Sequence, residues 1–303
     1  MREPIISDQD FIRRLSEEER KHAGFISTKE IFPLVCEHAA LLESGIKPVG
    51  AIPTGFIKLD KALIGLKKAD LIVVGAEPCV GKTAFVLSLA ENMAHKGMKV
   101  GIFSLDTLRE KIMQRLIAIR TSIPLWRIVT GRLNKGDMKR IEQCAESFKK
   151  LPLYIDDETD LDVLELRSRA TELRDKDGLD FLIVDCFQFI RSFDNEPHNL
   201  NRVACGLKMI AVELNISIVI TLNMERKQSD HHFPNFHDIR QWSLDRYADV
   251  VLMLRQSNQF EVDGSIRPID IFVLKNKNGP TGMVELGFDY ELASFIDAVE
   301  SKK

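Results

Sequence analysis

Paired cysteines, long apolar runs and an excess of one charge are all missing from this sequence of 303 residues. The five cysteines lie far apart without a CxxC pair. In a chain that lacks an export signal, such an odd, scattered set is typical of a reduced, cytoplasmic protein. No apolar run approaches the ~18 residues of a membrane span, and the N-terminus MREPIISDQDF is acidic and polar. We therefore expect a cytoplasmic protein with neither a membrane span nor an export signal.

A globally basic surface is missing too, because the formal net charge is −3. Any contact with nucleic acid must therefore come from local loops or from a channel that several subunits build together. What the chain does have is 45% hydrophobic and 29% charged residues. This composition suits one large or two ordinary globular domains with a full-sized core.

Residues 71–89 read LIVVGAEPCVGKTAFVLSL, and the apolar spacing on either side of AEPCVGKT indicates a strand, a loop and a helix. In a phosphate-binding loop, backbone N–H groups hold phosphate oxygens, a lysine neutralises the outer phosphates and a hydroxyl holds Mg²⁺. Lys82 and Thr83 supply the last two groups, although the usual first glycine is an alanine here. The alternative is a chance turn that carries a lysine. We predict that the phosphates of a nucleotide are bound by Ala76, Glu77, Pro78, Cys79, Val80, Gly81, Lys82 and Thr83.

From about residue 50 onward, strand and helix patterns alternate. The expected strands are LIVVG, KVGIFSL, PLYIDD, LDFLIVD, ISIVITL and ADVVLML, with helices at 82–95, within 109–148, at 161–175 and at 199–214. Strands this apolar are covered on both faces, which predicts an α/β fold with a mostly parallel sheet flanked by helices. The segment PIDIFVLKNKNGPTGMVELGFD predicts a C-terminal β-hairpin that turns at NKNGPTG.

Ahead of this region, residues 1–26 are charged and patternless, which is typical of a mobile or partner-docked arm. Ser27 is expected to cap a helix, with Glu30 three residues later. The predicted organisation is therefore an arm over 1–26, a helical segment over 27–50 and one α/β domain over 51–303.

Polar side chains follow several of the expected strands. Because ligands bind at the carboxyl ends of strands in such a sheet, the sequence predicts that one group of residues meets there: Lys82, Thr83, Asp106, Asp185 and Asn223.

Taken together, these motifs resemble the ATPase domain of replicative DNA helicases of the DnaB family, a RecA-like motor. The resemblance runs from about residue 52 to about residue 296 and is carried by IPTGFIKLD, GKTA, FSLDT, LIVDCFQFI, LKMIAVELN and KNKNGPTGMVELGFD. It implies ATP and Mg²⁺ as cofactors and a homo-oligomeric ring, usually a hexamer. Such a ring hydrolyses ATP between neighbouring subunits and moves along single-stranded DNA in replication. A helicase loader is a further candidate partner. The family's separate N-terminal collar domain is expected to be absent, since only about 50 residues precede the match.

The resemblance also implies roles at the strand ends. Asp185 would hold the metal together with Thr83. Asp106 stands where the family has a glutamate that orients or deprotonates the attacking water, and Asn223 where it has a glutamine that senses the γ-phosphate. Both departures shorten the side chain by one methylene. For Asp106 and Asp185, an acidic cap on the following segment is the alternative.

In the terminal hairpin, Lys275 and Lys277 stand where the family has a lysine and an arginine that reach into the neighbouring subunit's site. Lysine keeps the charge but lacks the planar, two-pronged guanidinium, and a solvated turn lysine is the alternative for Lys277. Two explanations of these departures remain. The chain is a working but slower motor, which the intact Lys82, Thr83 and Asp185 favour, or a catalytically weakened member with an assembly or regulatory role in a helicase ring.

Single-stranded DNA in such rings is held by its phosphates, through loop backbone and basic side chains. The resemblance makes Arg226, Lys227, Arg240 and Gln241 the DNA-binding candidates, although DIRQWSLDRYADVV departs from the family's pattern and a solvated loop would look alike. The helix of 27–50 resembles the family's linker helix, which docks on the adjacent subunit. Its apolar face should then promote self-association, and the residues on it are Ile31, Leu34, Val35 and Leu42.

Overall fold

The computed structural model describes residues 27–43, 51–191, 200–224, 233–257 and 265–297. The chain divides into two compact units, Met1–Ile52 and Pro53–Lys303. The described elements of the first unit are helix α2 (Thr28–Glu43) and strand β1 (Ala51–Ile52). The expected arm over 1–26 lies outside the described residues. The second unit contains the central sheet and every candidate residue that the structure describes beyond α2.

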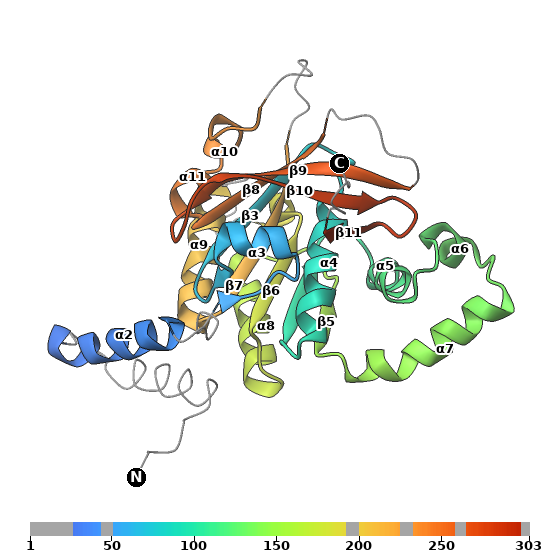
Figure 1. The fold of residues 1–303 in the computed structure, drawn as a ribbon, viewed down its shortest axis with the longest axis horizontal. Coiled ribbons are helices and arrows are strands. Elements are labelled where there is room, and N and C mark those ends of the chain that lie inside the picture. Colours follow the sequence, from blue (N-terminus) through green and yellow to red (C-terminus); the bar gives the residue numbers. More distant parts are fainter. Residues whose placement is uncertain (1–26, 44–50, 192–199, 225–232, 258–264, 298–303) are drawn as a thin grey trace, which may run out of the picture. The chain divides into compact units, whose positions relative to one another are not determined.

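Nine strands of the second unit form one sheet in the order β11-β10-β9-β8-β3-β7-β6-β4-β5 (Figure 1). Neighbours from β8 to β5 are parallel, whereas β8, β9, β10 and β11 pair antiparallel. The prediction of a mostly parallel sheet with a C-terminal hairpin is thus confirmed. The strands are β3 (Leu71–Ala76), β4 (Val100–Ser104), β5 (Leu153–Asp156), β6 (Phe181–Asp185), β7 (Ser217–Asn223), β8 (Val250–Gln256), β9 (Ile266–Asn276), β10 (Gly282–Asp289) and β11 (Ser294–Asp297), with β2 (Leu66–Lys67) outside this sheet.

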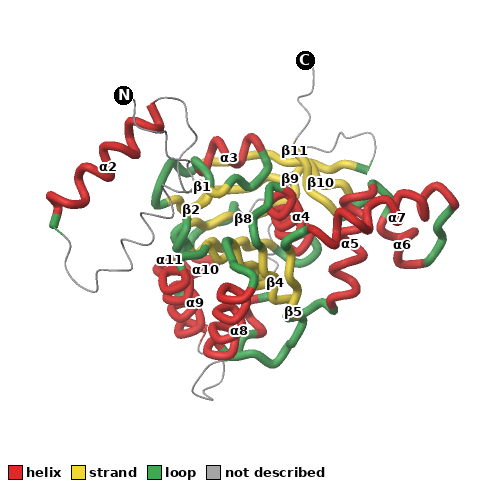
Figure 2. The backbone as a smooth tube through the Cα atoms, turned by 90° about the horizontal axis from the view of Figure 1, so that it is seen from below, coloured by secondary structure: helices red, strands yellow, loops and turns green. Residues whose placement is uncertain are grey.

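Helices cover both faces of the sheet, as predicted. Figure 2 shows the strands between α4 on one side and α8 and α9 on the other. The helices are α3 (Ile57–Leu63), α4 (Lys82–His95), α5 (Arg109–Thr121), α6 (Leu125–Thr130), α7 (Lys135–Lys150), α8 (Val163–Lys176), α9 (Leu200–Leu214), α10 (His237–Arg240) and α11 (Leu244–Tyr247), with a 3₁₀ turn η1 (Phe187–Phe189). None of these described helices has the length and apolarity needed to cross a membrane.

The core lies on both sides of the central strands because their residues are apolar at nearly every position. All residues of β3, β4 and β6 are buried, as expected for parallel strands that are covered on two faces. On the α4 side, Phe85 stacks on Phe56 at 5.8 Å between ring centroids and meets Phe295 of β11 edge-on at 5.3 Å. This aromatic group anchors the first turn of α4, and therefore the loop that precedes it.

Candidate functional site

The loop of residues 77–81 connects β3 to α4, so that a strand, a loop and a helix follow one another as the sequence predicts. Its last residue, Gly81, has a φ of +107°, a conformation that favours glycine. An added Cβ there would also lie 3.2 Å from the ring of Phe295. Backbone conformation and aromatic packing together explain why the loop needs glycine at this position.

Lys82 is the first residue of α4, and its side chain is buried. The Nζ amine turns back over the loop and donates hydrogen bonds to the carbonyls of Ala76 at 3.1 Å and Glu77 at 3.0 Å. Burial lowers the pKa of Lys82, and the nearby Asp185 carboxylate opposes this shift. The loop therefore curls around one ammonium group, a geometry suited to holding an anion against it.

Asp185 ends β6 and meets two hydroxyls. Thr83 Oγ1 donates to Asp185 Oδ2 at 2.8 Å, and Thr221 Oγ1 donates to Asp185 Oδ1 at 2.6 Å. Burial raises the pKa of Asp185, whereas the hydrogen bonds from Thr221 and Thr83 oppose the rise. A hydroxyl and a carboxylate in contact are oxygen ligands of the kind that Mg²⁺ takes beside substrate phosphates. The residues present therefore fit a magnesium ion.

The described residues contain no group of three or more His, Cys, Asp or Glu side chains that could hold a metal ion by themselves. Mg²⁺ itself keeps several waters and uses only one or two protein carboxylates together with phosphates.

A cavity of about 620 Å³ opens beside this group, a volume within the usual range for small-molecule sites. Five residues predicted to meet at the strand ends line it together: Lys82, Thr83, Asp106, Asp185 and Asn223. Of the other predicted loop residues, Pro78, Cys79 and Gly81 line the cavity as well. Ala76 and Glu77 contribute the carbonyls that hold Lys82.

Asp106 follows β4 and is exposed to the cavity. The turn that carries it is held by Ser104, whose Oγ donates to the carbonyl of Thr107 at 2.5 Å. Across the cavity, the Nδ2 amide of Asn223 contacts Cys186 Sγ at 3.4 Å. Both shortened side chains therefore face the cavity where the sequence predicts them.

Six further residues line the cavity that the sequence did not single out: Ala84, Arg115 of α5, Cys186, Thr221, Phe288 at the end of β10, and Tyr290. The rings of Phe288 and Tyr290 lie 4.5 Å apart, and Arg267 stacks 4.4 Å from the centroid of Tyr290. Aromatic and guanidinium planes are suited to stacking on a nucleobase. No local pattern identifies Arg115, Phe288 and Tyr290, because they reach the cavity only through the packing of α5 and the hairpin.

Lys275 and Lys277 lie away from this cavity, at the end of β9 where Asn276 pairs with Val250 of β8. Because β8 runs parallel to β3, this is the edge of the sheet opposite the phosphate loop. Lys277 Nζ donates to Asp249 Oδ1 at 2.6 Å, and Lys275 Nζ donates to the carbonyl of Asp245 at 2.8 Å. Neither lysine contributes to the cavity of its own chain.

Asp249 is buried at the edge of the sheet opposite the phosphate loop, where it accepts several hydrogen bonds. Its Oδ2 accepts the backbone N–H of Leu71 at 2.9 Å and the Lys208 Nζ at 2.5 Å, besides the Lys277 contact on Oδ1. Burial disfavours the charge, but the hydrogen bonds from Lys208 and Lys277 outweigh it and lower the pKa of Asp249. The base of β3 is thus tied to α9 and to the terminal hairpin by one carboxylate.

Of the predicted DNA-binding residues, Arg240 and Gln241 lie at the end of α10 and are exposed. Arg240 Nε is 3.8 Å from Asp245 Oδ2. Arg226 and Lys227 lie outside the described residues. The structure therefore describes only half of this candidate set.

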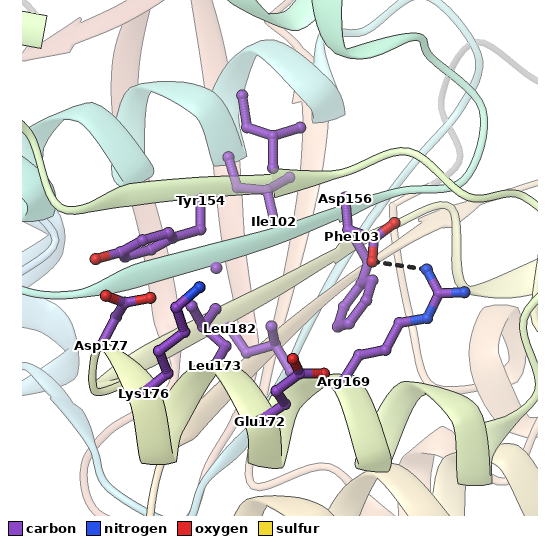
Figure 3. A pocket seen from close by; sticks show the side chains of 12 residues that line it. Ile102, Phe103, Tyr154, Asp156, Arg169, Glu172, Leu173, Lys176, Asp177 and Leu182 are labelled. Atoms are coloured by element: carbon purple, nitrogen blue, oxygen red, sulfur yellow. Dashed lines mark hydrogen bonds and ion pairs between the residues drawn. The ribbon is translucent and has the colours of Figure 1, made fainter. Parts of the chain in front are cut away.

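A second cavity, of about 470 Å³, lies beside the edge strand β5 and helix α8 (Figure 3). Its floor is apolar, and an ion pair between Arg169 Nη1 and Asp156 Oδ2 at 2.9 Å closes one end. Burial, helped by Asp177, raises the pKa of the Tyr154 hydroxyl at the other end. None of the residues predicted for nucleotide binding lines this cavity, so the candidate site is the one at the phosphate loop.

A phosphate loop after β3 whose threonine meets the acidic end of β6, a parallel strand two places away in the sheet, places the chain in the class of RecA-like, phosphate-loop nucleotide-binding α/β proteins. A family model described as the DnaB-like helicase C terminal domain matches residues 51–297. The chain belongs to this family of DnaB-like helicase C-terminal domains, and the resemblance inferred from the sequence is confirmed.

Two relatives with curated names belong to the same kind of protein. The chain is 30% identical to the replicative DNA helicase DnaB of Geobacillus stearothermophilus, over 97% of this chain and 67% of that protein. It is 31% identical to the replicative DNA helicase DnaC of Bacillus subtilis (strain 168), over 91% of this chain and 63% of that protein. A solved structure of a DnaB-like replicative helicase has the same fold with a TM-score of 0.79 at 23% identity, and the match covers 96% of this chain and 72% of that one.

Proposed function

We propose that this chain is an ATP-dependent DNA helicase motor, which hydrolyses ATP where two copies of the chain meet and translocates on single-stranded DNA in replication. The observation that carries the proposal is the group of Lys82, Thr83 and Asp185 around one cavity, in a chain whose relatives are named replicative DNA helicases. The proposal includes a homo-oligomeric ring of six subunits, a cytoplasmic location and a helicase loader as a further partner.

In this proposal the chain's own residues hold the triphosphate. The Lys82 ammonium exchanges its two carbonyl partners for phosphate oxygens, which are stronger, charged acceptors. Thr83 and Asp185 would hold Mg²⁺, which when bound would neutralise negative charge on the phosphates. Arg115 and Tyr290, which line the same cavity, contact the base in this proposal.

Asp106 orients the attacking water in this proposal. Phosphoryl transfer depends on an in-line nucleophile, and a displacement of ~1 Å can cost on the order of 10²-fold in rate. Aspartate is one methylene shorter than the family's glutamate, so we propose a motor that turns over more slowly than its relatives.

A neighbouring copy completes the site, because Lys275 and Lys277 lie at the sheet edge opposite the phosphate loop of their own chain. Helix α2 offers a surface for such contacts. Three of its apolar side chains are exposed, with 42% of Ile31, 69% of Phe32 and 57% of Val35 accessible. We propose that 27–50 links copies of the chain, that 1–26 is an arm, and that 51–303 is the motor domain.

DNA contacts are proposed for the loop that precedes β8. The candidates are Arg226, Lys227, Arg240 and Gln241, of which Arg240 and Gln241 are exposed at the end of α10. Binding through phosphates predicts little sequence preference and a strong dependence on salt.

Hydrolysis of ATP, measured with and without single-stranded DNA, tests the proposal. Lys82→Ala should lower turnover by more than about 10²-fold, since the cationic contact to the transferred group is lost. Asp106→Glu should raise turnover up to about tenfold, since the longer carboxylate reaches the water. Lys96→Ala, on an exposed lysine after the same helix, is the matched control and should behave as the wild type.

The second candidate is a nucleotide-binding family member with an assembly or regulatory role in a helicase ring. It is favoured by the shortened Asp106 and Asn223, both of which face the cavity. If the wild type and Asp106→Glu both bind ATP without hydrolysing it, the second candidate replaces the motor.

A further inference from the structure

Gln188 makes an unusual contact beside the nucleotide cavity. It lies in the 3₁₀ turn η1, which leaves β6 after Asp185 through Cys186 at a φ of +73°. The amide of Gln188 forms two hydrogen bonds with a single residue. Its Nε2 donates to the carbonyl of Asn223 at 2.7 Å, and its Oε1 accepts the backbone N–H of Asn223 at 3.2 Å.

These two hydrogen bonds lie beyond the point where the backbone pairing between β6 and β7 ends. The paired register of the two strands ends at Val184 and Ile220, three residues before Asn223. A primary amide carries a donor and an acceptor, as a strand backbone does. The side chain of Gln188 therefore takes the place of a paired backbone residue and holds Asn223, the last residue of β7.

The other side of Asn223 is held by β3. Asn223 pairs with Ala76, the last residue before the phosphate loop. Its backbone is thus fixed from two directions, by the strand that leads into the phosphate loop and by the turn that follows the metal-binding carboxylate.

The side chain of Asn223, in contrast, is held only weakly. Its Nδ2 donates to Cys186 Sγ at 3.4 Å, and a thiol sulfur is a weak acceptor. A phosphate oxygen is the stronger partner, so the amide can exchange sulfur for phosphate at little cost. The asparagine side chain has only two rotatable bonds. The position of the Asn223 backbone therefore largely determines where its amide group lies.

We propose that Gln188 is a positioning residue. Through the backbone of Asn223, it sets the place from which the Asn223 amide reads the terminal phosphate of a nucleoside triphosphate. Gln188 itself does not line the cavity, so it acts through Asn223. This inference rests on the proposed function of the site.

Gln188→Met keeps the side-chain length and removes both hydrogen bonds. Calorimetric affinities for a slowly hydrolysed ATP analogue and for ADP should show an analogue-over-ADP preference reduced about tenfold, with ADP affinity unchanged. Turnover should fall while the melting temperature stays close to that of the wild type. Gln143→Met, on an exposed glutamine of α7, is the matched control.

A double-mutant cycle with Asn223→Ala tests whether the effect passes through Asn223. The double variant should be no worse than Asn223→Ala alone. Additive losses, an equal loss of ADP affinity, or an unchanged analogue-over-ADP preference in Gln188→Met each overturn the inference while the proposed function stands. A wild type that binds neither nucleotide overturns both.

Discussion

At the scale of single residues, the surroundings of Asp70 disfavour the ionised form of its carboxyl group. It directly precedes β3 and is 9% exposed. Burial, followed by repulsion from Asp249, raises the pKa of Asp70 to about 6, although Lys208, Lys67 and Lys277 pull it down. The Asn278 amide donates to its carboxylate at 3.3 Å. The ionised form of Asp70 is therefore poorly compensated at neutral pH.

Because the pKa of Asp70 is higher in the folded state than the ordinary 3.8, the folded protein binds this proton more tightly. The resulting stabilisation is full below about pH 4 and is lost as the pH rises through about 6. Asp70→Asn should therefore raise the free energy of unfolding at pH 7.5 by about 3 kcal/mol, and should bring no gain at pH 4. Urea unfolding at both pH values measures this difference. Glu158→Gln, at an exposed carboxyl, is the control, and an equal effect at both pH values would contradict the assignment.

The residues of the candidate site differ in how far the sequence could predict them. Lys82, Thr83 and Asp185 belong to short segments in which a strand end and a phosphate-loop pattern coincide, so local sequence suffices. Arg115 and Tyr290 reach the cavity from α5 and from the end of the hairpin, and only tertiary packing brings them there. The placement of these residues is observed, but the roles assigned to Lys82, Thr83, Asp185, Asp106, Asn223, Lys275 and Lys277 all stay predictions.

At the scale of elements, α8 begins with a capping box. The Asp162 carboxylate accepts the N–H groups of Leu164 at 2.8 Å and Glu165 at 2.9 Å, and Glu165 accepts the N–H of Asp162 in return. Asp162→Ala should therefore cost about 1 kcal/mol of the free energy of unfolding, as measured in urea. Ser168→Ala, at an exposed mid-helix position, should be nearly neutral. Equal effects of the two variants would refute a capping role.

Strong periodic patterns predict the longer elements, and the differences fall where the pattern is weak. Helix α4 spans Lys82–His95, as predicted, and the helices expected within 109–148 are α5, α6 and α7, which are separated near Pro124 and Gly131, with α7 continuing to Lys150. Proline disfavours a helical residue before it, and Gly131 ends α6 with a φ of +68°. The sequence does not predict strand β11, which has only four residues.

At the scale of the whole molecule, Lys82 and Lys277 lie at opposite edges of the same sheet, and the proposed function therefore requires two chains for a complete site. Lys82→Ala and Lys277→Ala should each lose ATP hydrolysis when purified alone. Mixed, they should regain part of it, because some interfaces then combine an intact Lys82 with an intact Lys277. ATP turnover across mixing ratios measures this recovery.

Two controls sharpen the mixing experiment. The exposed Lys96→Ala variant mixed with Lys82→Ala shows the activity expected from simple dilution. Sedimentation of each variant with ATP and Mg²⁺ shows whether it still assembles. Assembly without any recovery in the mixture would contradict a site that is shared between chains.

The hydrogen bonds that Asp249 accepts from Leu71 and Lys277 connect two distant parts of the fold. One carboxylate joins the tip of the hairpin to the first residue of β3, and β3 is a rod of about 20 Å that opens at its far end into the phosphate loop. If the proposed function holds, a change at Lys277 would be transmitted through Asp249 and β3 toward Lys82, at the other end of that strand. In an assembly of copies, each subunit would therefore couple its Lys277, at one interface, to its Lys82, at the phosphate loop.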